Sequence, residues 1–201
     1  MKEKILITCF EPFGGESFNA SAAVVAAMPE EIAGARAEKI TLPVEFGRGA
    51  KLAIAAARKS RACLIVAFGE ARARKAVTPE LVAINHAYAA IPDNAGKMPR
   101  GESIDKGGAA AYFTPFPARR LAELIKEDGA LSSLSYSAGA YVCNDLYYRL
   151  LHEFEGSGVR VLFIHVPRTE SEAAYAETAR AVAAALSKVL CEEADVENVK
   201  K

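Results

Sequence analysis

The amino-acid sequence predicts an α/β fold with a largely parallel sheet between helices, and three observations support this. Short runs at residues 5–10, 63–68 and 159–166 are apolar nearly throughout, as in strands that helices cover on both faces. Alanine-rich segments with helical spacing alternate with these runs. The length of 201 residues suits a single domain, residues 1–201, with room for a large core.

The elements follow one another in a simple alternation. After the first strand, Asn19 is expected to cap a helix that ends before Pro29. A weaker run at residues 37–42 indicates another strand. Residues 197–201 are expected to form a disordered tail. The remaining expected elements are helices at 46–59, 117–127, 141–154 and 170–190 and the strands at 63–68 and 159–166.

Residues 70–116 interrupt the alternation. This segment contains four prolines and several glycines, and it has few long periodic runs. It is therefore expected to be a loop region, and loops of this length in a compact domain are usually functional.

Composition excludes several classes of function. The chain has 25 Lys and Arg against 25 Asp and Glu, so no net charge attracts nucleic acid or a membrane surface. The small self-repulsion makes self-association easy. No apolar stretch approaches the ~20 residues that span a bilayer, and the amino terminus lacks signal-peptide features. The scattered cysteines favour free thiols in the cytoplasm, and no metal-ligand spacing occurs, so we expect no metal.

Cys143 is the first candidate for chemistry. Small residues and a glycine precede it, and a helical pattern follows, which puts Cys143 in the first turn or two of a helix. Free amides and the helix dipole there stabilise a thiolate, and the same amides can receive an oxyanion. The alternative is a small buried hydrophobic residue, as most free cysteines are.

His165 and Glu80 are the candidates for proton transfer. His165 ends an apolar run two residues before Pro167, so it is expected at the carboxyl end of a strand, where α/β sheets bind ligands. Glu80 adjoins an apolar run, and a buried carboxylate needs a partner such as an imidazole. The alternatives are a hydrogen-bonded core histidine and a surface glutamate.

The loop after the first strand contains two aromatic residues beside paired glycines. Phe10 and Phe13 are suited to frame a small flat ligand. The alternative is a tight strand-to-helix turn with Phe10 in the core. No phosphate-binding glycine pattern is present.

Several segments, in this order, resemble the pyroglutamyl peptidase I (pyrrolidone-carboxylate peptidase) family. The resemblance covers most of the chain and rests on residues 8–15, 42–46, 91–96, 137–144 and 163–167. It implies a single α/β/α sandwich with a twisted, mixed sheet, no cofactor, and homo-oligomers, either tetramers or dimers. The family removes N-terminal pyroglutamate from peptides with a Cys-His-Glu triad.

The resemblance also assigns roles to individual residues. Cys143 matches the nucleophile, His165 the base and Glu80 the orienting carboxylate. The substrate-binding positions are Phe10, Phe13, Glu70 and Ile91.

Three departures from the family pattern concern the site. Members usually have Gly-Gln-Ala-Gly-Gly-Arg where this chain has Gly69-Glu-Ala-Arg-Ala-Arg74. Glu70 accepts hydrogen bonds but, when ionised, donates none. Arg72 and Ala73 replace glycines and restrict positive φ. Ala90 replaces an arginine near the active site, and losing one oxyanion stabiliser can cost on the order of 10²-fold in rate.

The sequence thus predicts a cysteine peptidase that acts on N-terminal pyroglutamate through an acyl-enzyme. The departures leave two alternatives, a non-catalytic relative that only binds and a hydrolase of another small cyclic amide or acyl group. Against the first stands the complete triad.

Overall fold

The computed structural model describes residues 3–169 and 171–199, with side chains up to residue 194. The strands of the main sheet are β1 (Lys4–Phe10), β2 (Glu31–Ile32), β3 (Ala35–Leu42), β4 (Leu64–Glu70), β5 (Thr78–Pro79) and β10 (Arg160–Val166). Their order in the sheet is β2-β3-β1-β4-β10-β5. The four central strands run parallel, and each edge strand is antiparallel to its neighbour. The predicted mixed, largely parallel sheet is confirmed.

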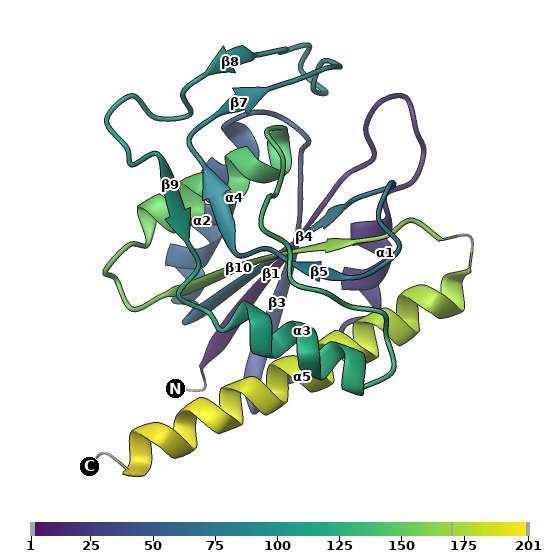
Figure 1. Cartoon of the computed structure of the whole chain (residues 1–201), viewed down its shortest axis with the longest axis vertical. Helices are drawn as coiled ribbons and strands as arrows, with labels where there is room; N and C mark the ends of the chain where they lie inside the picture. The colour runs from purple at the N-terminus through teal and green to yellow at the C-terminus, as the bar shows by residue number, and fades with distance from the viewer. Residues whose placement is uncertain (1–2, 170, 200–201) are drawn as a thin grey trace.

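Helices cover both faces of this sheet, so the predicted α/β/α sandwich is also confirmed (Figure 1). One layer holds α1 (Ala20–Ala27), α3 (Ala118–Glu127) and α5 (Glu172–Val199). The other holds α2 (Arg48–Ser60) and α4 (Val142–Glu153). Within the described part of the chain, no helix has the length and apolarity to cross a membrane.

The two-residue period of the strands divides the core between the two layers. On β10, Leu162 and Ile164 belong to the cluster under α1, α3 and α5, whereas Val161 and Phe163 belong to the cluster under α2 and α4. By the same alternation, the side chain of His165 lies on the face that α4 covers.

Residues 70–116 correct the expectation of an irregular loop. Besides β5 they contain β6 (Val82–Ile84), β7 (Ala87–Tyr88), β8 (Arg100–Glu102) and β9 (Ala111–Phe113). β6 pairs with β9 and β7 with β8, and the β7–β8 ladder lies at the top of Figure 1, beyond α4. These strands have two or three residues each, which is too short for a periodic pattern to reveal.

The ends of the helices mostly agree with the predictions. The Asn19 side chain accepts a hydrogen bond from the Ser21 amide at 3.0 Å, so the predicted cap of α1 is confirmed. Helix α5 continues through Val199 and so includes the first three residues of the expected tail. Residues 200 and 201 of that tail, and residue 170 at the expected start of the helix, lie outside the described residues.

Candidate active site

His165 and Glu80 are brought together by the pairing of β10 with β5. His165 lies opposite Thr78 in that pairing, and the Glu80 amide donates to the Phe163 carbonyl at 2.8 Å. Both side chains are buried, and His165 Nδ1 lies 2.7 Å from Glu80 Oε1. Because a carboxylate only accepts, Nδ1 carries the proton and Nε2 is left as the free base.

Arg74 completes the surroundings of Glu80. Its guanidinium donates to Glu80 Oε1 and Thr78 Oγ1, and also to the Ser137 carbonyl at 2.9 Å. The other carboxylate oxygen, Oε2, is buried and has no hydrogen-bond partner among the described residues. Arg74 therefore compensates a buried charge and ties it to the segment that leads into α4.

Cys143 is the second residue of α4, as predicted from the helix-start pattern. Gly139 at φ 79° makes the turn before the helix, and the first amides of a helix have no partner within it. Gly69 of β4 lets the thiol approach the sheet. A Cβ at this position would lie 2.8 Å from Cys143 Sγ and 2.8 Å from the Phe163 ring, closer than such atoms come.

Electrostatics favour a neutral thiol and a neutral imidazole in the free protein. Burial raises the pKa of Cys143 to about 12, and the charge of Glu80 contributes to this rise. Burial lowers the pKa of His165 from its ordinary value, although the hydrogen bond that His165 donates to Glu80 acts in the opposite direction. The site thus combines a neutral thiol with an uncharged imidazole that is able to accept a proton.

The side chains of Cys143 and His165 line one cavity of about 150 Å³. A cavity of roughly this size holds a benzene-sized ring. Its walls are mostly apolar, and the polar groups are few, as in small-molecule sites. The lining residues are Phe10, Phe13, Asn19, Val44, Glu70, Ala138, Gly139, Ala140, Tyr141, Val142, Cys143 and His165.

Glu70 is a carboxylate in the wall of this cavity. Its side chain is 0% exposed. Oε2 accepts from the amide of Ala20, the first residue of α1, at 2.6 Å, and Oε1 accepts from Arg72 Nε at 2.7 Å. The helix amino terminus and the guanidinium together compensate its charge.

The other predicted site residues lie outside the cavity wall. Ile91 is 47% exposed and lies beside Gly14, so its contact with substrate stays a prediction. Ala73 and Ala90 are exposed. Neither Arg72 nor Ala73 has a positive φ, so the loop does not use the freedom that glycines would give.

Seven of the lining residues were not predicted as parts of a site, among them Asn19, Val44 and Tyr141. Asn19 was expected only as a helix cap, and Val44 only as part of a matching segment. Tyr141 was expected only as the start of a helix. Its hydroxyl donates to the Pro92 carbonyl at 3.0 Å, and its ring packs edge-on against Phe46. The sequence showed that Asn19 caps a helix and that Tyr141 is aromatic. No local pattern indicated that either residue faces a cavity.

An α/β sandwich whose cavity contains a thiol at a helix start, with an imidazole held by a buried carboxylate, has the constellation of a cysteine hydrolase. Among the described residues, no group of three or more His, Cys, Asp or Glu side chains is arranged to hold a metal ion.

Comparisons with known proteins agree with this class. The family model described as pyroglutamyl peptidase matches residues 3–199. The pyrrolidone-carboxylate peptidase of Lactobacillus acidophilus is 39% identical over 173 residues, 84% of this chain and 86% of that protein. The chain belongs to the pyroglutamyl peptidase family, and it is a hydrolase of the cysteine peptidase type.

Solved structures lead to the same family. Pyroglutamyl peptidase I of Bacillus amyloliquefaciens superposes with a TM-score of 0.84 at 36% identity, covering 92% of this chain and 97% of that one. The pyrrolidone carboxyl peptidase of Pyrococcus furiosus gives a TM-score of 0.87 at 31% identity and covers 94% and 99%. The fold is therefore that of the family over nearly the whole chain.

Proposed function

We propose that this protein removes N-terminal pyroglutamate from peptides, with Cys143 as nucleophile, His165 as general base and Glu80 as the carboxylate that orients it. The observation that carries the proposal is that His165, hydrogen-bonded to the buried Glu80, lines the same cavity as the Cys143 thiol, in a chain of this family. The names of the relatives support the substrate class.

The chemistry begins with proton transfer. His165 Nε2 takes the thiol proton as Cys143 Sγ attacks the carbonyl carbon of the pyroglutamyl group. Glu80 steadies the imidazolium that forms. The amides at the start of α4 receive the oxyanion, and His165 then protonates the leaving amine, so the amide bond breaks. Water, deprotonated by His165, hydrolyses the thioester and releases pyroglutamate.

The cavity suits the proposed substrate in size and polarity. A five-membered lactam is flat and uncharged, which fits a ring-sized cavity between Phe10, Phe13 and Val44. A free α-ammonium group would lie in the same mostly apolar space. Desolvating that charge disfavours peptides with an ordinary amino terminus.

The decisive experiment measures hydrolysis of a fluorogenic pyroglutamyl amide by the wild type, Cys143→Ala and Cys191→Ala. Cys191 is exposed and outside the cavity, so its variant is a matched control for losing a thiol. We expect activity in the wild type and the control, and at least a 10³-fold loss in Cys143→Ala. Full activity in Cys143→Ala would falsify the assigned nucleophile.

A second candidate substrate follows from Glu70. A carboxylate in the cavity wall, where the family resemblance indicates glutamine, changes the pattern of donors and acceptors offered to a ligand. The candidate is another small cyclic amide or acyl group. A panel of acyl amides tests it, because a higher kcat/KM for a different ring would replace pyroglutamate as the substrate. Binding without turnover across the panel would indicate a non-catalytic relative.

The proposal extends to a cytoplasmic protein that forms homo-oligomers. The balanced charge supports self-association, as do Phe113 and Leu131, large apolar side chains that are mostly exposed. Sedimentation velocity measures the assembly state, and a purely monomeric protein at micromolar concentration would contradict this part.

A further inference from the structure

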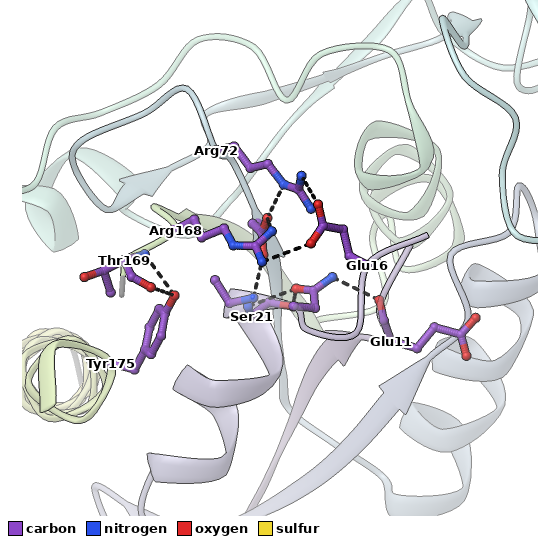
Figure 2. Close-up of polar contacts among 10 residues, drawn as sticks. Glu11, Glu16, Ser21, Arg72, Arg168, Thr169 and Tyr175 are labelled. Atoms are coloured by element: carbon purple, nitrogen blue, oxygen red, sulfur yellow. Dashed lines mark hydrogen bonds and ion pairs between the residues drawn. The ribbon is translucent and has the colours of Figure 1, made fainter. Parts of the chain in front are cut away.

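Four charged side chains join three separate segments next to the cavity that Phe13 and Glu70 line, a position we call its mouth. Figure 2 shows three of them, Glu16, Arg72 and Arg168. Arg72, after β4, donates to Glu16 at 2.8 Å and to Glu70 at 2.7 Å. Arg168, after β10, donates to the other oxygen of Glu16 at 3.1 Å and lies 3.7 Å from Glu70. Two arginines thus bridge two carboxylates, and we call these four residues the mouth cluster.

The mouth cluster is fixed at one end and solvated at the other. The Glu70 side chain is fully buried and is held by the Ala20 amide, whereas the Glu16 and Arg72 side chains are partly exposed. The hydrogen bond from Arg72, followed by that from Arg168, lowers the pKa of Glu16. Glu16 therefore stays ionised under mildly acidic conditions, and the loop that contains it stays tied to the buried anchor.

The same arginines also contact the aromatic residues on either side of Glu16. The Arg72 guanidinium carbon lies 5.5 Å from the Phe13 ring centre, and that of Arg168 lies 5.6 Å from the Phe18 ring centre. Phe13 and Tyr141 both line the cavity, and their rings pack against each other with ring centres 6.3 Å apart. The position of the Phe13 ring is thus determined partly by Arg72.

We propose that Arg72 is a positioning residue for substrate recognition, which holds the segment of residues 11–18 so that Phe13 closes the wall of the substrate cavity. The proposal rests on the proposed function for its kinetic consequence, but not for its structural one. The family resemblance indicates glycine at position 72, so this contact belongs to the present chain.

The expected kinetic effect is confined to binding. Arg72 does not line the cavity and does not belong to the proposed triad, so its loss leaves kcat nearly unchanged. Partly exposed ion pairs and cation–π contacts are each worth up to ~1 kcal/mol, which corresponds to a rise in KM of about five-fold. Salt screens such contacts, so the wild-type KM rises with ionic strength.

The experiment compares Arg72→Gln, Arg72→Lys and Arg120→Gln with the wild type. Arg120 is the matched control, because it pairs with Glu192 between α3 and α5, away from the cavity. One readout is KM and kcat for the pyroglutamyl amide at ~0.05 M and ~1 M sodium chloride. The other is hydrogen exchange of the backbone amides of residues 11–18, which needs no activity.

The expected result is a raised, salt-insensitive KM and faster exchange of residues 11–18 in Arg72→Gln. The lysine variant lies between, because it keeps the charge but loses the planar fork. Wild-type KM, salt response and exchange in Arg72→Gln would overturn the proposal. If the wild type hydrolyses no pyroglutamyl amide, the proposed function fails, and exchange alone decides whether Arg72 holds the segment.

Discussion

The proposed triad, which we call the corner, and the mouth of the cavity are held together by different kinds of contact. At the corner, Cys143, His165 and Glu80 are positioned by strand register, a glycine and buried hydrogen bonds. At the mouth, Phe13 is positioned by partly exposed side chains, chiefly Arg72 and its partner Glu16. The side chains of Arg72 and Glu16 are more exposed to salt and solvent than those of His165 and Glu80.

This difference predicts that the two regions affect different kinetic constants. Buried, geometrically constrained groups control the rate of chemistry, because a small displacement there is costly. Exposed ion pairs contribute little each and control how well the ring is held. Changes at the corner should therefore lower kcat strongly, and changes at the mouth should alter KM weakly.

The largest expected effect is that of Glu80→Gln. The glutamine is nearly the same size but presents an NH₂ group that favours the wrong tautomer of His165. We expect kcat to fall on the order of 10³-fold with little change in KM. Steady-state kinetics measure this, with Glu38→Gln, whose side chain pairs with Lys4, as the control. An unchanged kcat would mean that Glu80 does not orient the base.

The next effect is that of Gly69→Ala. The added methyl group meets Cys143 Sγ and the Phe163 ring at 2.8 Å, so the thiol or the strand has to shift. A displacement of ~1 Å at a reacting atom costs about 10²-fold in kcat. Gly107→Ala is the control, because its new Cβ meets only Asp105 Oδ1 at 3.6 Å. Thermal unfolding separates a shifted thiol from a failure to fold, and retention of wild-type kcat would refute the contact.

Arg74→Gln is expected to have an intermediate effect with a diagnostic pH dependence. The positive charge of Arg74 lowers the pKa values of His165 and Cys143, so its removal raises both. The acid limb of the kcat/KM profile, set by protonation of His165, then moves to higher pH. We expect a loss of about ten-fold at neutral pH from the missing charged hydrogen bonds.

Arg74→Lys checks the same mechanism. It keeps the charge, so its acid limb should lie nearer to the wild type than that of Arg74→Gln. Arg48→Gln, a surface variant paired with Glu45, controls for losing an arginine. An acid limb that does not move in Arg74→Gln would exclude an electrostatic role.

The smallest effect concerns Glu70 and Arg72 at the mouth. In Glu70→Gln the side-chain oxygen still accepts a hydrogen bond from the Ala20 amide. The side-chain NH₂ group, itself a donor, then faces the Arg72 guanidinium, which also only donates. We expect KM to rise several-fold, and to rise less when Arg72→Gly is also present, with a coupling of ~1 kcal/mol. KM values of the two single variants and the double variant measure this. Additive changes would show that the two positions act separately.

Local sequence patterns were sufficient for much of this architecture. The apolar run that ends at His165, two residues before Pro167, predicted a strand with a histidine at its carboxyl end. Strand β10 is that strand. The small residues before Cys143 predicted a helix start at residue 141, and α4 begins at Val142. Such signals need only a few neighbouring residues, so a single sequence contains them.

The remaining features depend on pairing between distant segments. Gly69 matters only because β4 lies beside β10 and beneath α4, and this register is not visible in any local pattern. Glu80 meets His165 because a two-residue strand, β5, adds to the sheet edge. Arg74 had no predicted role, yet its guanidinium binds Glu80 and the Ser137 carbonyl, which lies 63 residues further along the chain.

Desolvation of the Cys143 thiol, which raises its pKa, has a consequence for chemical labelling. Thiolates, not thiols, are alkylated and oxidised, and a pKa of about 12 leaves very little thiolate at neutral pH. The exposed Cys191 should therefore react with iodoacetamide before Cys143 does. An inhibitor that first fills the ring-sized cavity should label Cys143 far faster than a small alkylating reagent, because it holds its reactive group beside the thiol.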